Sequence, residues 1–171
     1  MRKRQYSKLE LLNTCYEIAE NAFLGKVNLA GKPYFSHLTS VALKVKEFGG
    51  TAVATALLHD LLEDCDAWSQ SALLLALPNY PSSKKIVDYV LLLTHNKKDL
   101  TYEEYISRLI NSKKIIPLQV KKADLEDNMD LTRILFLTDK DVRRIIKYHT
   151  AWVRVSAAIK ELEKNKYHEH N

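Results

Sequence analysis

Apolar residues recur three and four positions apart along almost the whole chain, and this spacing is interrupted by only four glycines and four prolines. An apolar stripe with this period buries one face of an α-helix. Glycine and proline fall between the periodic segments and mark the loops. The pattern predicts an all-α protein. Because 171 residues suit one domain with its own core, we expect residues 1–171 to form a single domain.

Capping residues and chain breaks delimit about eight helices. Ser7 is a candidate N-cap, and Thr101 with Glu104 and Thr138 with Asp141 follow the capping-box spacing. The expected helices cover roughly residues 7–23, 36–48, 52–65, 69–77, 83–93, 101–110, 117–133 and 138 to the charged tail.

Composition places the chain among ordinary globular proteins. The 26 lysines and arginines exceed the 21 acidic residues, and the formal charge of +5 suits a nucleotide polyphosphate as well as a nucleic acid. Cys15 and Cys65 both lie inside helical patterns, so a disulfide framework is not expected and a reducing cytoplasm fits best. The sequence lacks the run of roughly 18 apolar residues that a membrane span needs.

The segment LLHDLLED carries the first indication of chemistry. It places His59 and Asp60 side by side in an otherwise apolar helix, where burying ionisable groups requires compensation. Since a helix turns about 100° per residue, Glu63 follows His59 and Asp64 follows Asp60 by one turn. Four polar groups therefore share one broad helix face.

A second polar cluster lies in VKKADLEDNMDL, where Asp124 and Asn128 stand one helical turn apart. His37 begins the helix after the loop GKPYFSH, and its imidazole can point inward from that terminus. Two imidazoles and two carboxylates suit a borderline divalent metal. The sequence thus contains the donor types of one metal site.

Structural explanations compete with this interpretation. A single histidine on an apolar helix is usually a hydrogen-bonded core residue, and the acidic residues of both clusters can pair with the numerous lysines. That alternative applies most directly to Glu63, Asp64, Asp127 and Asp130. The adjacency of His59 and Asp60 is harder to explain by packing alone.

His37, the His59–Asp60 pair and Asp124, in this order on successive helices, resemble the H…HD…D signature of HD-domain proteins. More narrowly, GKPYFSH, ATALLHDLLEDCD and VKKADLEDNMDL resemble the hydrolase domains of RelA/SpoT-type proteins and the small stand-alone alarmone hydrolases. The resemblance spans most of the chain. It implies a helical HD-domain fold around a metal site and a metal-dependent phosphohydrolase of the (p)ppGpp 3′-pyrophosphohydrolase type.

The resemblance also implies residue roles. His37, His59, Asp60 and Asp124 would bind one metal, usually manganese in that branch, while Glu63 and Asp64 act on water. Asn128 would line a nucleotide pocket. Phosphate charge would be met by basic groups of the neighbouring loops, and the candidates are Lys26, Lys32, His95, Lys97 and Lys98. The expected partner is a small nucleotide or phosphoester, not a nucleic acid or a membrane.

Two departures from the family pattern leave the identity of the substrate undecided. Phe23 and Asn28 stand where a histidine and an arginine are common, and Asn28 cannot grip a phosphate with two parallel hydrogen bonds as arginine does. A second hypothesis is therefore hydrolysis of another nucleotide or phosphoester at the same site. A third is a non-catalytic nucleotide- or RNA-binding module. The length leads us to expect the hydrolase portion alone, without a synthetase.

Overall fold

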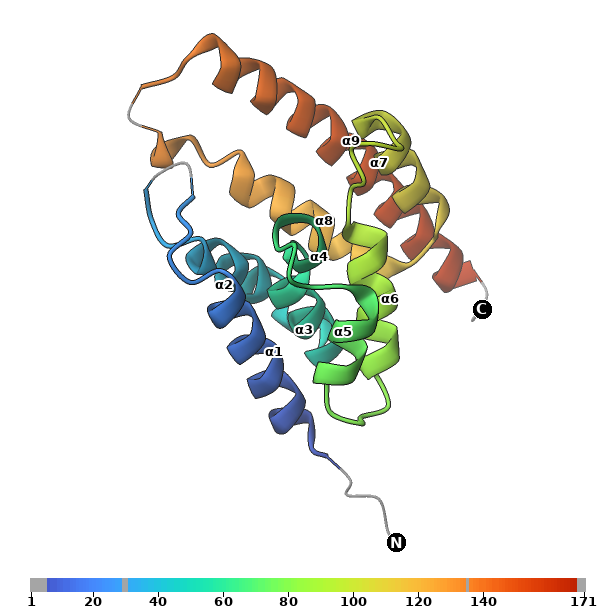
Figure 1. Cartoon of the computed structure of the whole chain (residues 1–171). Coiled ribbons are helices and arrows are strands. Elements are labelled where there is room, and N and C mark those ends of the chain that lie inside the picture. The colour runs from blue at the N-terminus through green and yellow to red at the C-terminus, as the bar shows by residue number, and fades with distance from the viewer. Residues whose placement is uncertain (1–5, 29–30, 135, 169–171) are drawn as a thin grey trace, which may run out of the picture.

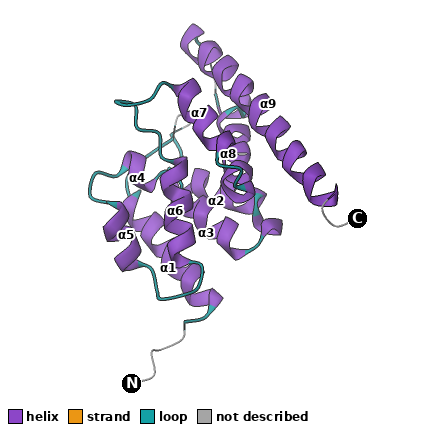
Figure 2. Ribbon diagram, turned by 90° about the vertical axis from the view of Figure 1, so that its right-hand side faces the viewer, coloured by secondary structure: helices purple, strands orange, loops and turns teal. Residues whose placement is uncertain are grey.

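The structure is a computed structural model that describes residues 6–28, 31–134 and 136–168. Over these residues the chain forms nine α-helices and two short 3₁₀ helices (Figures 1 and 2). The described residues contain no strand, and their one isolated β-bridge joins Val27 to Pro33 in the loop before α2. The all-α prediction is therefore confirmed, with nine helices in place of about eight.

The N-terminal half builds the centre of the molecule. Its helices are α1 (Lys8–Ala22), α2 (Phe35–Lys44), the 3₁₀ helix η1 (Lys46–Phe48), α3 (Gly50–Leu58) and α4 (Leu61–Asp64). Helix α3 packs against α1, α2, α6 and α8, so it is surrounded on several sides. Gly49 precedes α3 with φ of 90°, a conformation that favours glycine, and so allows the sharp turn from η1.

The C-terminal half wraps around this centre. It consists of α5 (Gln70–Ala76), α6 (Ser83–Leu93), α7 (Tyr102–Asn111), α8 (Ile115–Asn128), the 3₁₀ helix η2 (Leu131–Arg133) and α9 (Asp139–His168). The long helix α9 packs along α8 and α7, as Figure 1 shows. Helix α8 thus lies between α9 and the central helices α2 and α3.

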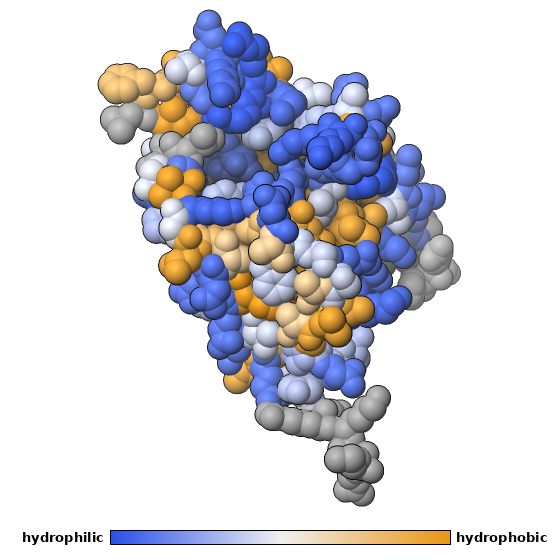
Figure 3. Space-filling model, viewed as in Figure 1, coloured by the Kyte–Doolittle hydropathy of each residue, from blue (hydrophilic) through white to orange (hydrophobic). Residues whose placement is uncertain are grey.

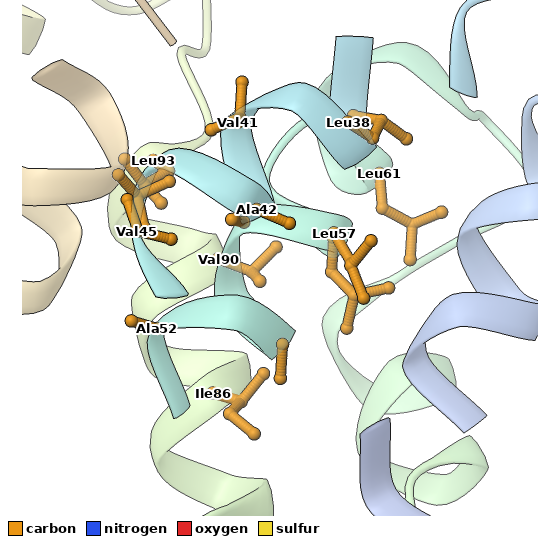
Figure 4. Close-up of a cluster of buried hydrophobic side chains, with 14 of the residues drawn as sticks. Leu38, Val41, Ala42, Val45, Ala52, Leu57, Leu61, Ile86, Val90 and Leu93 are labelled. Carbon is orange, nitrogen blue, oxygen red and sulfur yellow. The ribbon is translucent and has the colours of Figure 1, made fainter. Parts of the chain in front are cut away.

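Apolar side chains from α2, α3, α4 and α6 meet in the core (Figure 4). The labelled members of this cluster are Leu38, Val41, Ala42, Val45, Ala52, Leu57, Leu61, Ile86, Val90 and Leu93. Figure 3 shows hydrophilic side chains over most of the face in view, with apolar side chains in separate small groups. None of the helices in the described ranges has the length and hydropathy of a membrane span.

The predicted helix starts agree with the structure. Ser7 and Glu10 form a capping box at α1, and Thr101 and Glu104 form another at α7. At α9, Thr138 accepts a hydrogen bond from the Asp141 amide and donates one to its carboxylate. These local signals need no tertiary contacts, which explains why the sequence reveals them.

Two predicted boundaries are wrong. The helix expected over 52–65 is interrupted at His59 and Asp60, where Asp60 has ψ of −1° and the chain restarts as α4. The helix expected to reach residue 133 ends at Asn128, and residues 131–133 form η2. No glycine or proline marks either break, so tertiary contacts override the local helical pattern.

Candidate metal centre and adjoining cavity

Three helical elements bring the four predicted ligands together. His37 comes from the first turn of α2, His59 and Asp60 from the break between α3 and α4, and Asp124 from α8. Asp124 Oδ1 lies 3.3 Å from His37 Nε2 and 3.6 Å from His59 Nε2. Asp60 Oδ2 lies 3.7 Å and 3.0 Å from the same two nitrogens. Two carboxylates and two imidazoles thus converge on one point.

Both imidazoles are oriented by a hydrogen bond on the nitrogen away from this point. His37 Nδ1 donates to Asp127 Oδ2 at 2.6 Å, and Ser40 Oγ donates to the other oxygen of Asp127 at 2.5 Å. His59 Nδ1 donates to the carbonyl of Ala56 at 2.7 Å. Each Nε2 therefore faces the two carboxylates in a fixed ring orientation, as metal-binding histidines require.

Asp124 is held by two neighbours on its own helix. Lys121 Nζ donates to Oδ2 at 2.8 Å, and Asn128 Nδ2 donates to Oδ1 at 2.5 Å. The exposed fractions of the Lys121 and Asp124 side chains are 13% and 6%, so this ion pair lies largely out of water. One oxygen of Asp124 is thereby committed to Lys121, and the other faces the histidines.

The carboxylates control the charge of the site. Burial alone would lower the pKa of His37, but its contacts with the carboxylates of Asp124, Asp127 and Asp60 raise it to about 11. Burial would likewise lower the pKa of His59, which Asp60 and Asp124 raise to about 10. Although burial opposes this, His59 and His37 hold the pKa of Asp60 below the ordinary value, and Lys121 together with both histidines does the same for Asp124. The surroundings of this point thus favour positive charge.

The residues present fit a divalent metal. His59 Nε2 is buried and forms no hydrogen bond in the described structure, although Asp60 Oδ2 lies 3.0 Å away. One donor atom each from His37, His59 and Asp60 lies within 4.8 Å of the others, and Asp124 Oδ1 approaches both histidines. A mixed nitrogen and oxygen donor set of this kind suits manganese, zinc or iron.

A cavity of about 380 Å³ opens beside this cluster, a volume within the usual range for small-molecule sites. Its walls come from α4, the loop between α6 and α7, the helices α7, α8 and α9, and Tyr34 just before α2. Carboxylates, lysines and tyrosines dominate the lining, which comprises Tyr34, Asp60, Glu63, Asp64, His95, Lys97, Tyr102, Tyr105, Lys121, Asp124, Leu125, Asn128, Lys147 and Tyr148.

The two predicted catalytic carboxylates both line the cavity but differ in their surroundings. Glu63 accepts a hydrogen bond from the His95 amide at 3.0 Å and forms an ion pair with Lys97 at 2.9 Å. Asp64 has a raised pKa because of burial and the nearby charges of Asp60 and Glu63. Glu63 is thus held by two partners, whereas the Asp64 carboxylate has a greater affinity for a proton than an ordinary aspartate.

The predicted phosphate-binding residues are only partly brought together. Lys97 and Asn128 line the cavity, and so does His95, whose Nε2 is directed at the Leu100 carbonyl 2.8 Å away. Lys26 instead faces a separate groove of about 650 Å³ beside α1, where its ammonium donates to the Asp64 carbonyl. Lys32 is exposed on the loop before α2 and is not among the cavity-lining residues.

Several residues that line the cavity carry no signal in the sequence that would place them there. Lys121 lies in the predicted VKKADLEDNMDL segment, but the sequence could not show that its ammonium reaches Asp124. Lys147 on α9 lies 4.6 Å from the ring centre of Tyr102 and 5.1 Å from that of Tyr148. Its position depends on the packing of α9 against α7 and α8, which local pattern does not reveal.

A solved structure shares this arrangement of helices. It is that of a metazoan ortholog of SpoT that hydrolyses ppGpp, and it matches with a TM-score of 0.67 and 16% sequence identity, covering 96% of this chain and 98% of that chain. The chain has the HD-domain fold. The fold predicted from the H…HD…D pattern is thereby confirmed over nearly the whole chain.

A protein of similar sequence also carries the name of a ppGpp hydrolase. It is named a probable guanosine-3′,5′-bis(diphosphate) 3′-pyrophosphohydrolase of Mycoplasma genitalium, and it is 26% identical over 139 residues, or 72% of this chain. The chain spans only 18% of the length of that relative. No model of a known protein family matches the chain. The two comparisons confirm the resemblance to RelA/SpoT-type hydrolases.

Proposed function

We propose that the chain is a metal-dependent phosphohydrolase that removes the 3′-diphosphate of a ppGpp-type alarmone. The observation that carries this proposal is the convergence of His37, His59, Asp60 and Asp124 beside a cavity lined by lysines and carboxylates. The HD-domain fold is shared with a protein that hydrolyses ppGpp, which supports the choice of substrate.

We assign His37 Nε2, His59 Nε2, Asp60 Oδ2 and Asp124 Oδ1 as the ligands of one divalent metal, and we propose manganese. When bound, such a metal lowers the pKa of water and polarises a phosphoryl oxygen. The protein's part is to fix the ligand orientation. Asp127 and the Ala56 carbonyl hold the two rings, while Lys121 and Asn128 hold Asp124.

The carboxylates beside the ligands manage the water's proton. We propose that Asp64 accepts it, because its raised pKa favours protonation and its side chain lines the cavity. Glu63 orients the attacking water, since the His95 amide and Lys97 hold the Glu63 carboxylate in place. Attack of this water on the phosphorus bonded to O3′ of ppGpp would break that P–O bond. It would release pyrophosphate and leave guanosine 5′-diphosphate with a protonated 3′-hydroxyl.

Lysines at the cavity wall supply positive charge for the substrate's phosphates. The candidates to bind phosphate are Lys147 and Lys97, whose side chain is 69% exposed although it pairs with Glu63. Lys121 is largely buried and committed to Asp124. Burial, together with the nearby charges of Lys121 and Lys97, lowers the pKa of Lys147. Preorganised cations of this kind stabilise charge that develops on phosphoryl oxygens. The binding roles predicted for Lys26, Lys32, His95 and Asn128 stay predictions.

A second candidate function is hydrolysis of another nucleotide or phosphoester at the same site. Lys26 donates to the Asp64 carbonyl and is not among the cavity-lining residues, and the Phe23 ring stacks on Tyr34 at a centroid distance of 4.8 Å. The cavity therefore presents the Tyr34 ring, backed by the buried Phe23, and no lysine from the loop after α1. This feature favours a substrate with fewer phosphates on that side.

We further propose that residues 1–171 act as one hydrolase domain in the cytoplasm, on a small nucleotide. Cys15 and Cys65 are free thiols, which is compatible with a reducing compartment. We do not propose RNA binding, because single-strand binding sites combine aromatic platforms with a positively charged groove, and this cavity is also lined by the carboxylates of Asp60, Glu63, Asp64 and Asp124.

A substrate panel separates the two candidate functions. The purified, manganese-loaded chain is incubated with ppGpp, pppGpp, guanosine 5′-monophosphate and 4-nitrophenyl phosphate, and pyrophosphate and phosphate release are measured separately. Pyrophosphate from ppGpp and pppGpp supports the first candidate. Phosphate from a monoester, with ppGpp left intact, supports the second.

A further inference from the structure

Tyr34 joins the predicted metal site to the predicted base through one hydroxyl group. The phenol oxygen lies 2.6 Å from Asp60 Oδ2 and 3.3 Å from Asp64 Oδ2, so it is within hydrogen-bond distance of both carboxylates. Asp60 Oδ2 is also the oxygen that faces the two imidazoles. A single O–H group therefore contacts a proposed ligand and a proposed catalytic residue.

Packing fixes the Tyr34 ring from two helices. Phe23, at the end of α1, stacks on the ring with centroids 4.8 Å apart and an interplanar angle of 9°. The His37 imidazole, on α2, packs against the Tyr34 ring in a T-shaped arrangement, with centroids 5.5 Å apart. Phe23 is only 2% exposed, so this contact is part of the core. The hydroxyl is thus presented by a rigid ring.

The charges around the hydroxyl explain what it does. Asp60 is the N-cap of α4 and Asp64 is its last residue, so the two are one helical turn apart. Two carboxylates at this spacing repel each other. A phenol donates a hydrogen bond without adding the positive charge of a lysine, which would compete with a metal cation. It can therefore hold both side chains at a set separation while the site keeps its negative charge.

We infer that Tyr34 is a positioning residue of this site: its hydroxyl fixes Asp60 for metal binding and sets the distance from Asp60 to Asp64. The inference rests on the proposed function for the role of the two carboxylates. The inference predicts a change in metal affinity as well as in the reaction rate, because an Asp60 carboxylate without this hydrogen bond is free to rotate away from the histidines.

The test is the Tyr34→Phe variant of the full chain, which keeps the aromatic ring and its stack on Phe23 and removes only the hydroxyl. Tyr16→Phe is the matched control, because the Tyr16 ring packs edge-on against Phe35 at 4.8 Å outside the cavity. Thermal denaturation establishes that both variants fold. Manganese affinity is measured by calorimetry on metal-stripped protein, and kcat and KM are measured with ppGpp.

We expect Tyr34→Phe to weaken manganese affinity and to lower kcat by roughly 10- to 100-fold each, the usual effect of losing a hydrogen bond to a metal ligand. KM should change less than kcat, and Tyr16→Phe should match the wild type. A merely structural ring would leave manganese affinity and kcat unchanged in Tyr34→Phe, and that result would overturn the inference.

The two proposals fail in different ways. If the wild type binds manganese, Tyr34→Phe binds it more weakly and neither cleaves ppGpp, the inference stands and the proposed substrate is wrong. If the wild type cleaves ppGpp and Tyr34→Phe does so with equal kcat and manganese affinity, only the inference is wrong. Absence of manganese binding by the folded wild type overturns both.

Discussion

His37 Nδ1 lies 2.6 Å from Asp127 Oδ2, and Asp127 stands on α8 three residues after Asp124. One helix therefore supplies both a candidate metal ligand and the carboxylate that orients a ligand from α2. The contact directs His37 Nε2 toward Asp60 and Asp124. It joins α2 to α8 at the site itself.

Replacing Asp127 should reduce metal binding without removing any ligand. The Asp127→Ala variant leaves the His37 ring without its hydrogen-bond acceptor, and we expect manganese affinity to fall roughly 10- to 100-fold. Calorimetric titration with manganese measures this effect. The exposed residue Asp88, paired with Lys84 on α6, provides the control Asp88→Ala. Equal affinity in the two variants would show that Asp127 does not orient a ligand.

Manganese should stabilise the folded chain, because the ligand cluster exists only in the folded state. At a free concentration 100 times the dissociation constant the stabilisation is about 2.7 kcal/mol, or roughly 5–10 °C in Tm for a protein of this size. Scanning calorimetry with manganese and with EDTA measures the difference. In His59→Ala the metal-dependent shift should disappear, and persistence of the full shift would place the metal elsewhere.

Several parts of the fold follow from local sequence signals. The capping boxes at Ser7 and Thr101 mark helix starts that the structure reproduces, because each is formed within a few residues. The break at His59 and Asp60 lacks such a signal. The helix is interrupted there, and His59 Nε2 lies beside the carboxylates of Asp60 and Asp124. Because Asp124 comes from α8, this arrangement forms only when the helices pack together.

For the site, the sequence predicted the four candidate metal ligands but not the contacts that hold them. His37, His59, Asp60 and Asp124 were recognisable by residue type and order, and the structure places them together. The surrounding contacts were not recognisable, because they join distant segments. Asp127 was expected at most to pair with a lysine and instead contacts His37 and Ser40. Lys26 was expected near phosphate and lies toward another groove.

Leu58 should be critical for stability. It is fully buried in α3, whose neighbours surround it, so Leu58→Ala should leave a cavity and cost about 2–5 kcal/mol of the free energy of unfolding. Leu75 on α5 is 86% exposed, and Leu75→Ala should change stability by less than about 0.5 kcal/mol. Urea denaturation compares the two. Similar losses in both variants would contradict the assigned core.

The capping box of α7 should make part of the stability depend on pH. Glu104 accepts hydrogen bonds from the Thr101 hydroxyl and amide, which hold the pKa of Glu104 below its ordinary value. This stabilisation is present above the unfolded pKa of glutamate, about 4.3, and is lost as the pH falls through the folded pKa. Glu104→Gln should therefore lower Tm at pH 7 and have a smaller effect in acid. A difference in Tm that is independent of pH would argue against this contribution.

Release of pyrophosphate from ppGpp, measured for the manganese-loaded and the metal-stripped chain, tests the central claim most directly. We predict release by the loaded chain, loss of release after stripping, recovery when manganese is restored, and no release by the Asp60→Ala variant. Equal release with and without metal, or full activity in Asp60→Ala, would contradict the proposed metal centre. A loaded, folded chain that leaves ppGpp intact would contradict the proposed activity.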